Sequence, residues 1–97
     1  MSKVLWMPSA LEDLRSLQEF ISRDSEVYAN KFVDDVFKVT ERLEIFPESG
    51  RIVPEIGIPT VREVIYGSYR IIYELMDDMV NIVAVIHGKR LLSDIMP

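Results

Sequence analysis

Cysteine is absent from this 97-residue chain, and histidine occurs once, at His87. Without cysteine the chain can form neither a disulfide framework nor a reactive thiolate, so we expect a protein of the bacterial cytoplasm. Zinc and iron sites need several Cys or His ligands, which this composition does not supply. We therefore expect no metal centre and no cofactor.

Long hydrophobic runs are also absent. No apolar stretch approaches the roughly 20 residues of a membrane-spanning helix, so we expect no membrane partner. Pro8 and Glu12 interrupt any signal-peptide pattern at the N-terminus. The hydrophobic content of 48% and the charged content of 28% are ordinary for a folded protein. We expect one domain over residues 1–97, with a single core.

Basic residues are few, at 11 against 16 acidic ones, and the formal net charge is −5. Residues 1–50 carry six basic and ten acidic side chains, and residues 51–97 carry five and six, which sum to −4 and −1. Non-specific binding of nucleic acid needs many Lys and Arg contacts to phosphate, so the balance disfavours it. The smaller excess in the second half leaves room for a local basic patch there.

Three runs rich in β-branched and aromatic residues fill residues 61–90, separated by Gly67-Ser68 and Asp77-Asp78. This pattern predicts a three-stranded antiparallel meander with two tight turns. The predicted register of the first hairpin pairs Tyr66 with Tyr69, Val64 with Ile71 and Arg62 with Tyr73. That of the second pairs Met76 with Met79, Tyr73 with Ile82, Ile71 with Ala84 and Tyr69 with Ile86.

Alternation along these strands predicts one apolar face that other elements must cover. Tyr66, Tyr69 and Tyr73 lie on that face, where core packing is favoured over a base-stacking platform. The opposite face is predicted to carry Glu63, Ile65, Arg70, Ile72, Glu74, Asn81, Val83, Val85 and His87. A slip of one residue in either hairpin would scatter this set.

The first half of the chain predicts a strand and two helices. Lys3–Met7 is a short apolar run that ends at Pro8, and apolar residues at helical spacing follow over about 8–23. Asp24 or Ser25 can cap a second helix, which Pro47 ends. Its apolar stripe spans five turns and favours packing within the chain over a coiled coil. The stripe consists of Ala29, Phe32, Val36, Val39, Leu43 and Phe46.

Prolines and glycines predict an irregular segment from Pro47 to Thr60, which is long for a loop in so small a domain and suggests a contact surface. Arg51 in this segment is a candidate to pair with a carboxylate. The tail Leu91–Pro97 holds four apolar residues, and either a helical turn or an extended strand end is compatible with it.

Several short motifs, taken in their order and spacing, resemble the RelE/ParE superfamily of toxins from type II toxin–antitoxin operons, and most of all its ParE branch, the plasmid stabilisation proteins. The motifs are Trp6-Met7-Pro8-Ser9-Ala10 with Asp13-Leu14, Leu43-x-x-x-Pro47-x-x-Gly50-Arg51, Val61-Arg62-Glu63, Tyr69-Arg70-Ile71-Ile72-Tyr73 and His87-Gly88-Lys89-Arg90.

The resemblance implies an α+β fold: an N-terminal strand, a two-helix hairpin, then the meander, with the helices on one face and the first strand beside the meander. It also implies a cognate antitoxin as partner, and either a homodimer or a toxin–antitoxin hetero-oligomer. ParE-like toxins poison DNA gyrase, whereas RelE-like toxins enter the ribosome and cut mRNA.

Carried over residue by residue, Arg70 matches the arginine with which nuclease members hold the scissile phosphate, and Arg90 matches a second basic residue. Val61 and Glu63 stand where the mRNA-cutting type has lysines, and Met96 stands where it has a tyrosine. RNA cleavage needs a general base, a general acid and positive charge for the phosphate. These departures therefore count against cleavage.

Three functions stay open. The first is a non-enzymatic ParE-like inhibitor that docks on gyrase, with Arg70, His87, Lys89 and Arg90 as candidate target contacts. The second is a ribosome-dependent endoribonuclease in which Glu63, Arg70 and His87 serve as base, phosphate clamp and acid. In the third, the chain has lost toxicity and keeps only antitoxin binding. A structural alternative makes Glu63 and Arg70 a half-exposed ion pair and His87 a strand end.

Overall fold

Three strands joined by two tight turns form the centre of the sheet in the computed structural model, which describes residues 1–89. They are β3 (Val61–Tyr66), β4 (Tyr69–Met76) and β5 (Met79–His87). Gly67 and Asp77 begin the two turns with φ of 55° and 53°, a region that tight hairpins use. The predicted meander is confirmed.

Two further strands extend the sheet to the order β1-β5-β4-β3-β2. Strand β1 (Lys3–Trp6) lies parallel to β5, the placement that the family resemblance implied. Strand β2 (Arg51–Ile52) pairs antiparallel with β3, inside the segment expected to be irregular.

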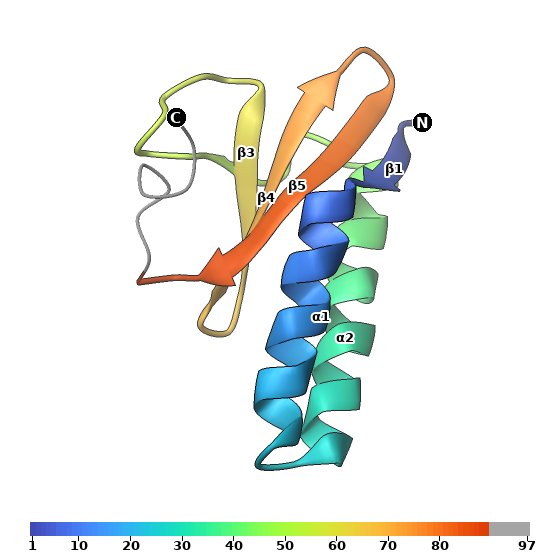
Figure 1. The fold of residues 1–97 in the computed structure, drawn as a ribbon. Helices are drawn as coiled ribbons and strands as arrows, with labels where there is room; N and C mark the ends of the chain where they lie inside the picture. Colours follow the sequence, from blue (N-terminus) through green and yellow to red (C-terminus); the bar gives the residue numbers. More distant parts are fainter. Residues whose placement is uncertain (90–97) are drawn as a thin grey trace.

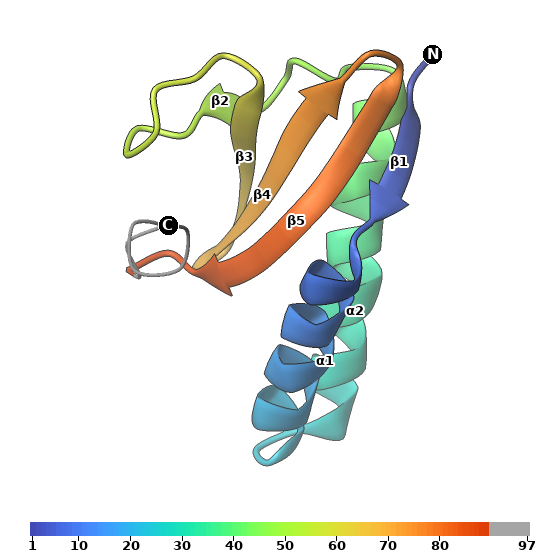
Figure 2. The same cartoon turned by 45° about the horizontal axis from the view of Figure 1, so that its top comes forward.

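Helices α1 (Pro8–Ser22) and α2 (Glu26–Glu41) form a hairpin that covers one face of the sheet, and the turn between them projects beyond it (Figures 1 and 2). Pro8 opens α1, where its missing N–H costs nothing. The Ser25 hydroxyl accepts a hydrogen bond from the Tyr28 N–H at 3.1 Å and caps α2, as predicted.

The main core lies between the hairpin and the sheet. The most deeply buried residues in it are Ala10, Val36, Ile71, Tyr73, Val80 and Ile82. All three tyrosines lie on this side, as predicted: the rings of Tyr66 and Tyr69 pack against Phe32, and Tyr73 is fully buried. The Tyr73 hydroxyl donates to the Pro47 carbonyl at 2.7 Å.

The hydroxyl of Tyr66 links the sheet to α2. It donates to Asp35 Oδ2 at 2.5 Å, and the ammonium of Lys31 contacts the same oxygen. These two hydrogen bonds lower the pKa of Asp35 below its ordinary value, and the bond from Lys31 has a larger effect than that from Tyr66.

Helix α2 ends earlier than predicted. A 3-10 turn, η1 (Arg42–Glu44), follows it before Pro47. Leu43 is buried, but the Phe46 side chain is 63% exposed, so its assignment to the apolar stripe was wrong. A 3-10 turn advances by three residues per turn rather than 3.6, which rotates later side chains off the stripe.

The predicted register holds for the whole first hairpin and for the turn end of the second, where Tyr73 pairs with Ile82. Beyond that point it is wrong. A β-bulge shifts the pairing between Ile72 and Tyr73, so that Ile71 faces Val85 and Tyr69 faces His87. The extra residue in β5 is Val83, and each later side chain therefore moves to the opposite face.

Side chains of α1 satisfy the backbone of β5 around the bulge. Strand β1 ends at Trp6, and beyond it the Ser9 hydroxyl donates to the Val83 carbonyl at 3.0 Å. The carboxylate of Asp13 accepts from the Val85 N–H at 3.0 Å. These two contacts stabilise the shifted register.

The second face of the sheet is covered as well. Val53 and Ile56, from the segment between β2 and β3, pack on Val61, Ile72, Ala84 and Ile86 in a second, smaller core. Val83 packs against this second core, on the face predicted for it. Because of the bulge, Ala84 and Ile86 also lie here, whereas Val85, predicted beside Arg70, lies in the main core. The segment from Pro47 to Thr60 is thus a cover for the face that carries Arg70 (Figure 2).

Candidate functional site

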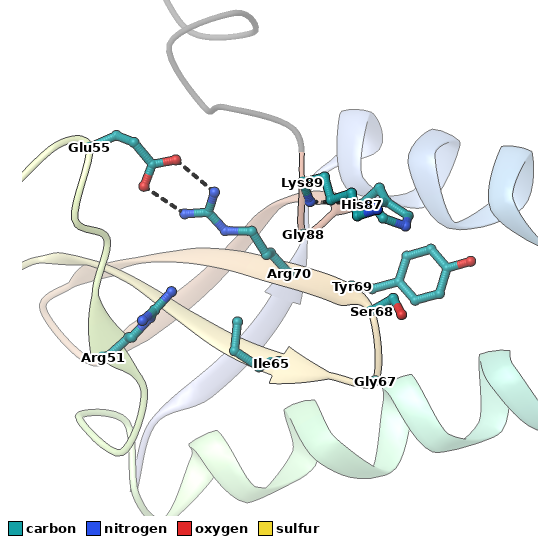
Figure 3. A pocket seen from close by; sticks show the side chains of 10 residues that line it. All are labelled: Arg51, Glu55, Ile65, Gly67, Ser68, Tyr69, Arg70, His87, Gly88 and Lys89. Carbon is teal, nitrogen blue, oxygen red and sulfur yellow. Dashed lines mark hydrogen bonds and ion pairs between the residues drawn. The ribbon is translucent and has the colours of Figure 1, made fainter.

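Arg70 lies at the centre of the candidate site, in the middle of the sheet and beneath the covering segment. Its guanidinium makes a two-pronged contact with the Glu55 carboxylate: Nη1 donates to Oε2 at 2.6 Å and Nη2 to Oε1 at 2.9 Å (Figure 3). Its Nε donates to Glu63 Oε1 at 2.5 Å. Bidentate contacts between arginine and carboxylate are among the strongest charge-assisted hydrogen bonds.

Glu63 bridges two arginines. Its side chain is 0% exposed, and its second oxygen accepts from Nε of Arg51, whose own side chain is 60% exposed. The predicted carboxylate partner of Arg51 is therefore Glu63. Strand pairing explains the contact, because Arg51 on β2 lies directly opposite Glu63 on β3.

The expectation of a half-exposed ion pair is wrong, since the Arg70 side chain is 6% exposed and that of Glu63 is fully buried. Within residues 1–89, the network joins two cations, Arg51 and Arg70, to two carboxylates, Glu55 and Glu63. The hydrogen bond with Glu55 has the larger effect and that with Glu63 the smaller, and together they raise the pKa of Arg70 above its ordinary value in spite of its burial. Arg70 is a cation whose charge is already matched.

A cavity of about 560 Å³ opens beside this network. Its ten described lining residues come from the covering segment, β3, the β3–β4 turn, β4, and the end of β5 with the two residues after it (Figure 3). Three of them are Lys or Arg (Arg51, Arg70 and Lys89) and one, Glu55, is acidic. The cavity therefore has a basic lining in a chain whose net charge is −5.

His87 lines the same cavity but does not join Glu63 and Arg70 on one face. The bulge turns it toward Tyr69, on which its ring packs edge-on with centroids 5.7 Å apart. The Lys89 N–H donates to His87 Nδ1 at 3.2 Å. The expected trio is therefore divided: Glu63 and Arg70 touch, whereas His87 lies at the other end of the cavity beside Tyr69 (Figure 3).

Of the other predicted target contacts, Lys89 is exposed at the rim of the cavity. Arg90 and the tail Leu91–Pro97 lie outside the described residues. Arg70 differs from Lys89 in being buried, and among residues 1–89 its guanidinium is covered by Glu55.

Glu55 is a residue of the candidate site that the sequence did not indicate. It lies among prolines and glycines in a segment expected to be irregular. One signal could have indicated its position. The predicted second face carried uncovered apolar residues, among them Ile72, and the apolar residues Val53 and Ile56 that flank Glu55 could cover them. A segment that covers this face brings the carboxylate between Val53 and Ile56 onto Arg70.

The arrangement is poorly suited to transfer of protons or phosphate as it stands. Both carboxylates are engaged by arginines, and the imidazole of His87 is turned to Tyr69. Within residues 1–89 no group of three or more His, Asp or Glu side chains could hold a metal ion. Neither helix in that range has the length and apolar character of a membrane span.

Comparisons with known proteins point to one family. Residues 4–92 match the model of the ParE toxin of type II toxin–antitoxin systems, parDE. Toxin RelE2 of Caulobacter vibrioides is 32% identical over 92 residues, which cover 94% of this chain and 100% of that protein.

Two solved structures share the fold. The chromosomal ParDE system of P. aeruginosa superposes with a TM-score of 0.75 at 17% identity, over 92% of this chain and 98% of that one. The RelBE2 toxin–antitoxin complex of Mycobacterium tuberculosis superposes with a TM-score of 0.59 at 22% identity, over 89% and 96%. The family model covers nearly the whole chain, and the chain therefore belongs to the ParE toxins of type II toxin–antitoxin systems, within the RelE/ParE superfamily.

Proposed function

We propose that this toxin acts by docking on a large protein target, with DNA gyrase as the first candidate, and that a cognate antitoxin silences it. Membership of the ParE family supports this choice, because gyrase is the target that the ParE resemblance implies. The ParDE and RelBE2 structures are named as toxin–antitoxin systems, which supports an antitoxin partner for this chain. The antitoxin complex is a hetero-oligomer, and a homodimer is the alternative for the toxin alone.

One observation carries the choice of docking over RNA cleavage. The arginine that a nuclease would use as phosphate clamp is held by two carboxylates, Glu55 and Glu63, and its side chain is 6% exposed. A scissile phosphate would approach carboxylates as closely as it approached the cation. Phosphoryl chemistry requires a positive charge that is free to stabilise the negative charge developing in the transition state. Here the positive charge of Arg70 is already balanced by the two carboxylates.

The docking surface that we propose surrounds the cavity. Ile65, Ser68, His87 and Lys89 are exposed there, and the Ile65 side chain is 51% accessible. Lys89 supplies an exposed cation and Ile65 an apolar contact. Arg90, by its place next to Lys89 in the sequence, belongs to the same proposal.

RNA cleavage is the second candidate, because the relative at 32% identity is named RelE2 and because Glu63 and Arg70 are in direct contact. On this proposal Glu63 is the base, Arg70 the clamp and His87 the acid. It requires Glu55 to leave Arg70 and His87 to turn from Tyr69.

Induced expression in bacteria separates the candidates. We expect growth arrest with filamentation and a DNA-damage response, intact mRNA, and rescue by co-expression of the antitoxin from the neighbouring reading frame. Translation arrest with cleaved mRNA would instead support the nuclease. A folded, antitoxin-binding chain without any phenotype would support the third candidate, a member that has lost toxicity.

Lys89→Gln tests the docking surface. We expect it to weaken growth arrest, because it removes an exposed cation at the cavity rim without disturbing the core. Lys38→Gln on α2 is the matched control, with the same change of charge at another exposed site. Equal toxicity of the two variants would remove Lys89 from the proposed surface.

A further inference from the structure

The Arg70–Glu55 pair has the form of a binding site that is occupied from within the chain. The guanidinium fork holds a carboxylate in the two-pronged geometry with which arginine binds carboxylate ligands. Glu55 approaches from the covering segment rather than from the sheet, and its side chain is 20% exposed (Figure 3). Arg70, in contrast, is fixed on the sheet by β4 and by Glu63.

We propose that Arg70 and the adjoining cavity form a carboxylate-binding site, that Glu55 occupies it in the free chain, and that an acidic side chain of a protein partner takes the place of Glu55. This proposal deepens the docking function, and the biological role of the carboxylate site rests on that function. The test of the site needs no target protein, so the carboxylate site and the docking function can each fail without the other.

The charges around the cavity favour an anionic ligand. Among the lining residues that the structure describes, Arg51, Arg70 and Lys89 are cationic and Glu55 is anionic, although acidic residues exceed basic ones in the whole chain. If Glu55 moves away, Arg51, Arg70 and Lys89 remain, and the buried Glu63 still pairs with the two arginines. Three cations then face one carboxylate, so the potential in the cavity attracts a negative group, and walls of low dielectric concentrate that field.

The ligand that fits best is a carboxylate on an otherwise apolar peptide. Ile65 lines the cavity beside the cations, which suits a neighbouring apolar side chain of a peptide. A nucleic acid would instead bring a row of phosphates toward a chain with a net charge of −5. We therefore favour an acidic segment of a protein over RNA or DNA.

The covering segment can release Glu55 without unfolding the sheet. Within residues 1–89, its backbone makes local turn hydrogen bonds, and the Pro59 carbonyl accepts from Arg62 Nε at 2.9 Å. At its two ends the Val53 N–H donates to the Val61 carbonyl at 3.1 Å, and the Thr60 carbonyl accepts from the Leu75 N–H at 2.8 Å. Gly57, with φ of 70°, lies two residues after Glu55, and a side chain there would meet no atom within 4 Å. Val53, which is 0% exposed, and Ile56 anchor the segment by packing. Release of Glu55 therefore needs only a local opening of the segment, which costs less free energy than global unfolding.

Substitution of Glu55 by Gln tests the site directly. Glutamine keeps the size of the side chain but loses its charge, so an external carboxylate no longer competes with an internal one. We expect sodium acetate to raise the melting temperature of the full-length Glu55→Gln chain at constant ionic strength, with an apparent dissociation constant at least about tenfold lower than that of the wild type. Acetate should shift the amide resonances of Gly67, Ser68 and Gly88, which line the cavity.

Two controls locate the effect. Glu48→Gln makes the same change of charge at an exposed position on the preceding turn and should behave like wild type. Glu55→Gln with Arg70→Lys keeps the positive charge but removes the fork, and should lose the tighter acetate binding. Circular dichroism confirms that each variant is folded.

Several outcomes would overturn the proposal. Acetate binding that is equal in wild type, Glu48→Gln and Glu55→Gln would show that Glu55 occupies no ligand site. Tight binding that persists with Arg70→Lys would place the anion elsewhere. Inorganic phosphate is the second probe, and binding of phosphate without binding of acetate would contradict a carboxylate ligand and indicate a nucleic-acid partner.

Discussion

Replacement of Arg70 by methionine tests how the buried network is held together. Methionine approaches arginine in length but carries no charge. It leaves Glu63, with a side chain that is 0% exposed, to Arg51 alone, and it leaves Glu55 without its partner on β4. Removing one member of a buried ion pair costs about 3–5 kcal/mol, because a buried charge is left uncompensated. Since Arg51 still reaches Glu63, we expect a loss near the lower end, about 3 kcal/mol.

That loss is a large share of the total. A domain of this length has a free energy of unfolding of about 5–15 kcal/mol, at roughly 0.05–0.15 kcal/mol per residue. The slope of a urea unfolding curve is about 1–3 kcal/mol per molar for small proteins, so the midpoint should fall by about 1–3 M. Urea titration followed by far-ultraviolet circular dichroism measures it.

A double-mutant cycle isolates the pair. Arg70→Met together with Glu63→Met replaces both charges by apolar groups and should recover most of the loss, because buried pairs replaced in this way are often neutral in stability. The reasoning is refuted if Arg70→Met costs less than about 1 kcal/mol, or if the double variant loses the sum of the two single changes.

Three further predictions concern the surroundings of the site. Tyr73→Phe should cost about 1–3 kcal/mol in urea unfolding, because both backbone partners of its hydroxyl lose a hydrogen bond in a buried place; an unchanged midpoint would contradict this. Gly50→Ala should lower the free energy of unfolding by about 2–3 kcal/mol, since a Cβ there would lie 2.6 Å from the Tyr73 hydroxyl. The control Gly57→Ala has open space around its Cβ and should lose only about 1 kcal/mol, through its positive φ. Tyr66→Phe removes one of the hydrogen bonds that lower the pKa of Asp35, so an NMR titration should find that pKa raised. A carboxyl group with a lowered pKa in the folded state contributes stability above its unfolded pKa of about 3.9, and this stability is lost as the pH falls through the folded pKa. Acid unfolding of Tyr66→Phe should therefore show a smaller loss of stability below about pH 4 than that of the wild type. Parallel acid unfolding curves for the two proteins would contradict this prediction.

The stability of the network bears on functional tests. A variant of Arg70 that is not toxic gives no information about catalysis if it is also unfolded. Toxicity of Arg70 variants should therefore be compared at equal concentrations of folded protein. Glu55→Gln and Lys89→Gln are better probes of function, since they change a partly exposed and an exposed side chain.

Local pattern was sufficient for the helix starts and the three meander strands, but it predicted neither β2 nor η1. Two-residue turns at Gly67 and Asp77 fix the hairpins, and the spacing of apolar residues with Pro8 and Ser25 fixes the helix starts. The position of β1 came from the family resemblance, because no local rule states which strand a short N-terminal strand joins.

The bulge at Val83 could not be predicted from the meander alone. Its partners are Ser9 and Asp13, more than 70 residues earlier, and they act because β1 ends at Trp6 and exposes the edge of β5 to α1. This one extra residue moved His87 away from Arg70, and it moved Ile86 toward Arg70. Alternation is a local rule, and a tertiary contact overrode it.

Glu55 was missed for a related reason. The sequence alone predicted that Pro47–Thr60 was irregular, but not that it would fold back over the second face of the sheet. The contact of Glu55 with Arg70 depends on that path of the chain, and it converts an arginine that suggested a phosphate clamp into one whose charge is already balanced.

The most direct test of the docking account adds the purified toxin in parallel to DNA gyrase and to ribosomes that carry a defined mRNA. The account predicts that supercoiling by gyrase is inhibited, that the mRNA stays intact, and that Lys89→Gln weakens the inhibition. Cleavage of ribosome-bound mRNA that is lost in folded Glu63→Gln, with gyrase activity unaffected, would contradict it.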